Sequence, residues 1–145
     1  MYLHDWAESE FFGMVMDFEG VFCTKAEYEA AQSPYSNHDM WIESKAKAKA
    51  AIEDPKYQGL DVLFASYCQG NYSGDAFVLF RKDGKLYEVN GGHCSCYGLE
   101  GQWDPEETSI EALRKRLDDG SLGAYDYCGN VFADELRAAL DGVSS

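Results

Sequence analysis

The middle of the chain carries the hydrophobic pattern of β-strands. Residues 60–68 alternate loosely between apolar and polar, residues 76–82 are apolar on both faces, and residues 85–90 alternate cleanly. Between the last two segments lies Asp83-Gly84, a dipeptide that favours a type I′ turn because both turn positions require positive φ. The pattern therefore predicts a three-stranded antiparallel sheet with residues 76–82 at its centre.

Three segments before these strands have helical features. Residues 6–23 place apolar residues at helical spacing but contain two glycines, so that a short helix and an edge strand both remain open. Thr24, with Glu27 three residues later, matches the capping box that begins a helix. The segment of about 38–53 is rich in strong helix formers, and polar residues before it can cap a helix.

Two further helices are expected after the strands. Pro105, followed by Glu106 and Glu107, predicts a helix start, because proline fits the first turn and acids favour the positive end of the helix dipole. Trp103 would then pack against this helix as a hydrophobic staple. A final helix of about 130–141 would end at the glycine that follows it.

Together these elements predict an α+β fold, a small antiparallel sheet packed by helices from both flanks. The chain has 145 residues, which is a common size for one domain, so residues 1–145 are expected to form a single domain. Apolar residues make up 46% of the chain and aromatic residues 14%, enough to exclude a disordered protein.

The net charge of the chain disfavours some classes of binding partner and favours others. Asp and Glu number 26 against 12 Lys and Arg, which gives a formal net charge of −14. Such a charge repels nucleic acid and anionic membranes and suits a partner with a basic groove, although solubility alone also explains it. No apolar run is long enough to span a membrane, no basic leader is visible, and an odd set of 5 cysteines suggests no disulfide framework, so a cytoplasmic location is expected.

The acids concentrate in the two terminal segments. If the chain termini meet, as domain termini often do, these acids would form one patch. The candidate contacts for a partner are therefore the acids of both segments with two neighbouring tyrosines: Asp5, Glu8, Glu10, Asp17, Glu19, Asp118, Asp119, Asp126, Tyr125 and Tyr127.

One segment could carry metal or thiol chemistry. Cys68, His93, Cys94 and Cys96 are ligand types that suit tetrahedral zinc, but a Cys-x-Cys spacing is tighter than the usual ligand gap. Buried thiols that act as small apolar side chains explain the same residues. His93 is also a poor base for Cys94, because neighbours on an extended segment point to opposite sides. We therefore expect no cofactor, with zinc as the alternative, and a binding role more than an enzyme, with no catalytic residue assigned.

The region from Asp61 to about Leu117 resembles a family of small, mostly uncharacterised proteins of bacteriophages and prophages. The resemblance is carried by LYEVNGGHCSCYGLE (86–100), Gln102-Trp103 and PEET (105–108). It implies a phage accessory protein that acts in the cytoplasm of a bacterial host. Small acidic phage proteins without a recognisable active site are often inhibitors, so the expected function is anti-CRISPR-like. The chain would bind and inhibit a host protein or ribonucleoprotein complex that handles nucleic acid, without binding nucleic acid or membrane directly, and DNA mimicry is one mode by which it would do so.

Overall fold

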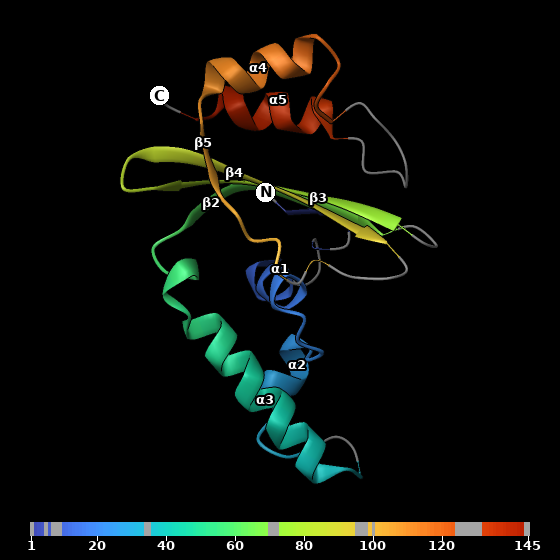
Figure 1. Cartoon of the computed structure of the whole chain (residues 1–145). Coiled ribbons are helices and arrows are strands. Elements are labelled where there is room, and N and C mark those ends of the chain that lie inside the picture. Colours follow the sequence, from blue (N-terminus) through green and yellow to red (C-terminus); the bar gives the residue numbers. More distant parts are fainter. Residues whose placement is uncertain are drawn as a thin grey trace.

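The computed structural model describes residues 2–4, 6, 10–33, 36–69, 73–94, 99, 101–123 and 132–143. Within these residues five strands form one sheet in the order β1-β2-β3-β4-β5 (Figure 1). β1 pairs with β2 in parallel, and every other pair is antiparallel. The strands are β1 (Tyr2–His4), β2 (Asp61–Gln69), β3 (Ser73–Lys82), β4 (Lys85–Cys94) and β5 (Glu106–Thr108).

The three predicted strands are confirmed as the centre of this sheet, with β3 in the middle. The sheet is larger than predicted because a short strand is added at each edge. β1 and β5 contain three residues each, which is too short for a period-two pattern to identify them. The predicted α+β class holds, and the antiparallel sheet becomes a mixed one through β1.

Helices cover both faces of the sheet (Figure 1). Those from the N-terminal half lie on one side and those from the C-terminal segment lie on the other. The first group leads away from the sheet along the longest helix, whose N-terminal end lies farthest from the strands. The helices are α1 (Glu10–Glu19), α2 (Lys25–Glu29), α3 (His38–Glu53), the 3-10 helix η1 (Pro55–Tyr57), α4 (Ile110–Asp118) and α5 (Ala133–Asp141).

Local capping signals in the N-terminal half are confirmed. The Thr24 hydroxyl accepts the backbone N–H of Glu27 at 3.1 Å at the start of α2. The Asn37 side chain accepts the N–H of Met40 at 3.5 Å at the start of α3. Each contact satisfies a backbone donor that the first helical turn leaves unpaired.

β3 carries apolar side chains on both faces because both faces are covered. Ala76, Val78 and Phe80 face the core formed with α1 and α3, whereas Phe77 and Leu79 face the core formed with α4 and α5. This two-sided burial explains the unbroken apolar run of residues 76–80. α4 and α5 contribute Leu113, Leu117, Leu136 and Leu140 to the second core.

The predicted helix start at Pro105 is wrong. Glu106 and Glu107 lie in β5, opposite Glu88 and Tyr87 of β4. The helix begins instead at Ile110, where the Ser109 hydroxyl accepts the N–H of Ala112 at 3.1 Å. β4 would otherwise have an unpaired outer edge there, and pairing that edge outweighs the preference of proline and acids for a first helical turn.

A buried ion pair ties α4 to the sheet. Nη1 of Arg116 donates to the two carboxylate oxygens of Glu88 at 2.6 and 2.8 Å, and Asn90 Nδ2 donates to the same carboxylate at 3.0 Å. The Glu88 side chain is only 7% exposed. Arg116 belongs to the basic triplet 114–116 and lies in the last turn of α4.

Removing the arginine should therefore be costly. We expect Arg116→Ala to lower the free energy of unfolding by about 3 kcal/mol, because it leaves the Glu88 carboxylate buried without its cation. Arg114→Ala is the matched control, since Arg114 pairs with a largely exposed carboxylate of Asp141 and should cost less than about 1 kcal/mol. Urea denaturation of the two variants checks this, and equal losses would contradict the assigned role of the pair.

The predicted turn between β3 and β4 is confirmed. Asp83 and Gly84 have φ of 55° and 78°, and Lys82 pairs with Lys85 across the turn. A side chain at position 84 would meet nothing within 4 Å, so the requirement for glycine comes from the backbone angle alone.

Gly84→Val should destabilise the protein by about 1 kcal/mol or more, because a β-branched residue resists positive φ. Gly92→Val in β4 is the control: its Cβ also meets nothing within 4 Å, and its φ is not positive. Urea denaturation should give a clearly lower midpoint for the first variant than for the second. If the two midpoints agree, the turn does not depend on the left-handed angle.

Candidate functional site

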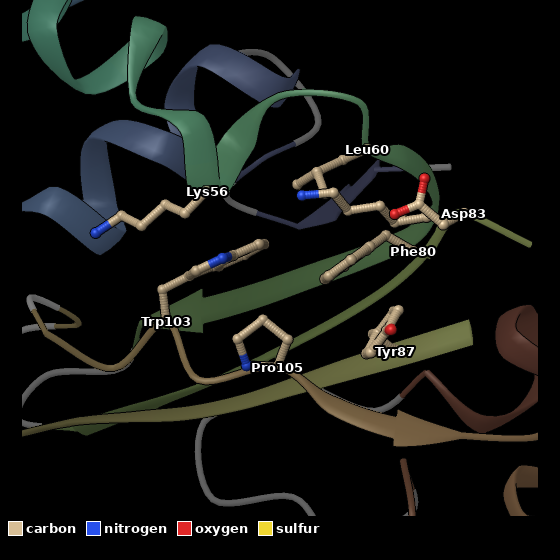
Figure 2. Close-up of a pocket in the computed structure, with 8 residues that line it drawn as sticks. Lys56, Leu60, Phe80, Asp83, Tyr87, Trp103 and Pro105 are labelled. Atoms are coloured by element: carbon tan, nitrogen blue, oxygen red, sulfur yellow. The ribbon is translucent and has the colours of Figure 1, made fainter. Parts of the chain in front are cut away.

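A cleft of about 470 Å³ lies on the α1 side of the sheet, near the turn between β3 and β4. Figure 2 shows aromatic side chains from the two strands and from the segment before β5 along its floor. We call it the aromatic cleft and define it by its lining residues: Lys56, Leu60, Phe80, Lys82, Asp83, Tyr87, Trp103 and Pro105.

Three rings form a row along this cleft. Phe80 and Tyr87 are cross-strand partners, with ring centroids 5.4 Å apart and planes within 22°. Trp103 continues the row on the other side of Phe80, at 5.6 Å and 11°. Phe80 is 2% exposed and forms the floor, whereas the other two rings are partly exposed and can be reached by a ligand.

Trp103 is positioned by the residue before it. The Gln102 side chain donates from Nε2 to the carbonyl of Gly92 at 2.7 Å and accepts the N–H of Gly92 at 2.8 Å. This pair of bonds imitates a strand contact and holds the segment before β5 against the outer edge of β4. Trp103 then packs on Phe18 and Tyr57, with ring centroids 5.0 Å apart in each case.

This geometry corrects the prediction that Trp103 packs near Ile110 on the following helix. Trp103 contacts the α1 core, on the opposite face of the sheet from Ile110. Gly91 has a related role, since a Cβ at its position would lie 3.1 Å from Leu99 Cδ2. Gly91 therefore permits the close approach of Leu99 and Gln102 to β4.

The wall of the cleft next to α1 carries a charged network. Glu19 Oε2 accepts the Tyr57 hydroxyl at 2.8 Å and lies 2.8 Å from Lys56 Nζ. In Figure 2 the Lys56 side chain extends its nitrogen away from Phe80 and Tyr87. Lys56 therefore lines the cleft with its hydrocarbon stem, and its charge is directed toward Glu19.

The N-terminal acids among the predicted contacts have structural roles where the structure describes them. Asp17 accepts the indole N–H of Trp6 at 2.7 Å, and Glu19 holds the network just described. Glu10 is exposed at the start of α1. Asp5 and Glu8 lie outside the described residues.

The C-terminal acids lie at one end of the helical pair α4–α5. Asp118 and Asp119 end α4, and Asp134 and Glu135 begin α5. Arg137 is 3.6 Å from the carboxylate of Asp118 and 3.7 Å from that of Asp134. We call these four carboxylates the acidic hairpin end. The other predicted contacts near it, Tyr125, Asp126 and Tyr127, lie outside the described residues.

Ser121 stabilises the charged form of one carboxylate at this end, that of Asp119. Hydrogen bonds to Asp119 from the Ser121 hydroxyl, and then from its backbone N–H, hold the pKa of that carboxyl below its usual value. The described acids of the two terminal segments do not form the single patch expected from meeting termini. α1 and α4 lie on opposite sides of the sheet (Figure 1).

The predicted zinc ligands fall partly outside the described region. Cys68 is in β2, opposite Asp75 of β3, whereas His93 and Cys94 are in β4, opposite Gly74 and Ser73 of β3. β3 thus runs between the two sets of backbone positions. The side chains of Cys68, His93 and Cys94, and all of Cys96, lie outside the described residues. Over the described side chains, no group of three or more His, Cys, Asp or Glu could hold a metal ion.

Comparison with known proteins adds no family to this picture. No family model, curated protein or solved structure matches the chain. In the part of the chain that the structure describes, no helix is both long enough and apolar enough to cross a membrane.

The buried tyrosines predict an alkaline instability. Burial, with a smaller contribution from Glu10, raises the pKa of Tyr2 from 10.0 to about 12. Burial, followed by the hydrogen bond to Glu19 and its negative charge, also raises the pKa of Tyr57. Unfolded tyrosines lose their protons near pH 10, so above this pH the unfolded state binds fewer protons than the folded state.

The free energy of unfolding should therefore be unaffected by these groups below pH 10 and should fall as the pH rises from about 10 to about 12. Urea denaturation at a series of pH values measures this fall. The double variant Tyr2→Phe, Tyr57→Phe should show a shallower dependence, because phenylalanine has no proton to release. Identical slopes for the two proteins would show that other groups cause the alkaline loss.

Proposed function

We propose that this chain is a phage-type accessory protein that binds and inhibits a host nucleic-acid-handling defence complex. The acidic hairpin end would contact a basic groove of that complex. The observation that carries the proposal is that the carboxylates of Asp118 and Asp134 lie on either helix beside Arg137, with Asp119 and Glu135 next to them in the chain.

The exposure of these acids supports a role at the surface. The side chains of Asp118 and Asp134 are 79% and 95% exposed, and their distances to Arg137 are long for ion pairs. Exposed pairs of this kind contribute little to folding stability. The carboxylates therefore remain available to a cationic partner.

The N-terminal acids make weaker contact candidates. Asp17 and Glu19 hold side chains of their own chain, Trp6, Lys56 and Tyr57. Of the two acidic segments predicted to bind a partner, the C-terminal one is therefore favoured. The candidate contacts narrow to Asp118 and Asp119, together with Asp126, Tyr125 and Tyr127.

The proposed mechanism is electrostatic. A groove that binds phosphates with Lys and Arg gains free energy by releasing the counterions around the nucleic acid. A folded array of carboxylates can occupy the same groove and block it. The formal charge of −14 also accelerates the encounter with a basic surface and disfavours direct binding of nucleic acid.

A capture experiment from bacterial lysate, followed by affinity measurements with the purified partner, tests this proposal. The affinity should fall steeply between low and high salt, because the Debye length decreases from about 10 Å at 0.1 M to about 3 Å at 1 M. The double reversal Asp118→Lys, Asp119→Lys should weaken binding by about tenfold or more while leaving the fold intact.

The double reversal Glu29→Lys, Glu53→Lys is the matched control. Glu29 and Glu53 are exposed, each is the last residue of its helix, α2 or α3, and both belong to the N-terminal group of helices. This double variant changes the net charge by the same amount as Asp118→Lys, Asp119→Lys. A difference in affinity between the two double variants therefore reports where the charges are, and not the total charge. An affinity that does not change with salt concentration, or that falls equally in both double variants, would refute an interface at the acidic hairpin end.

A further inference from the structure

The turn between β3 and β4 places two cations side by side. Lys82 and Lys85 are direct cross-strand partners, so their side chains leave the same face of the sheet. Among the residues that the structure describes, no carboxylate forms an ion pair with either lysine. Like charges in directly opposed positions destabilise a sheet, and an anion bound between them would remove the repulsion.

The same face continues from Lys82 into the aromatic cleft. Lys82 lines the cleft together with Phe80, and Phe80 is two residues before it on β3. Phe80 lies between the partly exposed rings of Tyr87 and Trp103, in the near-parallel row described above. A row of aromatic rings and a pair of cations thus lie at neighbouring positions on one face of the sheet.

The arrangement distinguishes between two kinds of aromatic site. A site for a quaternary ammonium group surrounds the cation with rings and excludes other positive charge. Here the rings form a row, within 11° and 22° of one another. The cleft is lined by Lys82, by Asp83 and by the stem of Lys56, whose charge pairs with Glu19. Rings in a row favour a flat ligand, and the lysines at positions 82 and 85, which form no ion pair within the described residues, favour an anionic one.

We propose that the aromatic cleft binds a mononucleotide. The base would lie against the exposed surfaces of Trp103 and Tyr87, and the phosphate would sit between the ammonium groups of Lys82 and Lys85. Stacking on aromatic side chains tolerates any base, because every base has a π face, whereas lysine recognises phosphate as a point charge.

The ligand is a mononucleotide and not a strand for two reasons. The cleft has a volume of about 470 Å³, within the usual range for small-molecule sites. A strand would extend its phosphates over the rest of a surface whose formal charge is −14, and each further phosphate would be repelled. This inference does not depend on the function proposed for the acidic hairpin end.

Isothermal titration calorimetry at low ionic strength tests the proposal with three probes. These are adenosine 5′-monophosphate, adenosine, which lacks the phosphate, and ribose 5-phosphate, which lacks the base. We expect saturable binding of the monophosphate and at least about tenfold weaker binding of each half, because both contacts are needed.

Variants then locate the site. Lys82→Ala should weaken monophosphate binding about tenfold and leave adenosine binding unchanged. Lys47→Ala is the matched control, since Lys47 is an exposed lysine on α3 whose partner is Glu43. Tyr87→Leu should weaken both adenosine and the monophosphate, and circular dichroism verifies that each variant is folded.

Three outcomes would overturn the proposal. The first is no saturable heat with the monophosphate at millimolar concentration. The second is an equal effect of Lys82→Ala and Lys47→Ala, which would indicate a general charge effect. The third is adenosine binding as tightly as the monophosphate, which would show that the lysine pair does not contact the ligand.

Discussion

The burial of β3 on both faces is the constraint on which the rest of the structure depends. From Ala76 to Phe80 no residue is more than 4% exposed, so each face of the strand needs its own covering layer. The chain meets this need by sending α1 and α3 to one side and α4 and α5 to the other. The separation of the two acidic segments follows directly, because each travels with its own helices. The burial of β3 on both faces thus also determines which charged side chains can lie close together.

The elements that sequence analysis predicted correctly are those set by local chemistry. Asp83-Gly84 fixes a turn through backbone angles, and that turn in turn places Phe80 opposite Tyr87. Thr24 caps α2 with the N–H of a residue three positions away. In each case the partners are close in the chain, so that the energy of the contact can be inferred without knowledge of the fold.

The features that were missed depend on partners distant in the chain. Pro105 and the acids after it have a strong preference for a helix start, yet Glu106 and Glu107 pair with the open edge of β4 as a strand. Trp103 lies on the α1 face because Gln102 bonds to Gly92, ten residues earlier. No period or composition reveals that bond, so the aromatic cleft was not predicted, although the two strands that carry Phe80 and Tyr87 were. The same holds for Arg116, whose buried partner Glu88 lies on an earlier strand.

The parallel pairing of β1 with β2 has a consequence for the order of folding. It joins Tyr2 to Ala65 across more than sixty residues, whereas the β2–β3 and β3–β4 pairs are sequence neighbours. Closing so long a loop costs conformational entropy, and the pairing of only three residues offsets little of that cost. We therefore expect the hairpins to form first and β1 to dock last. By the same balance we expect β1 to detach first, which would leave the outer edge of β2 with unpaired N–H and C=O groups that can pair with a strand of another chain.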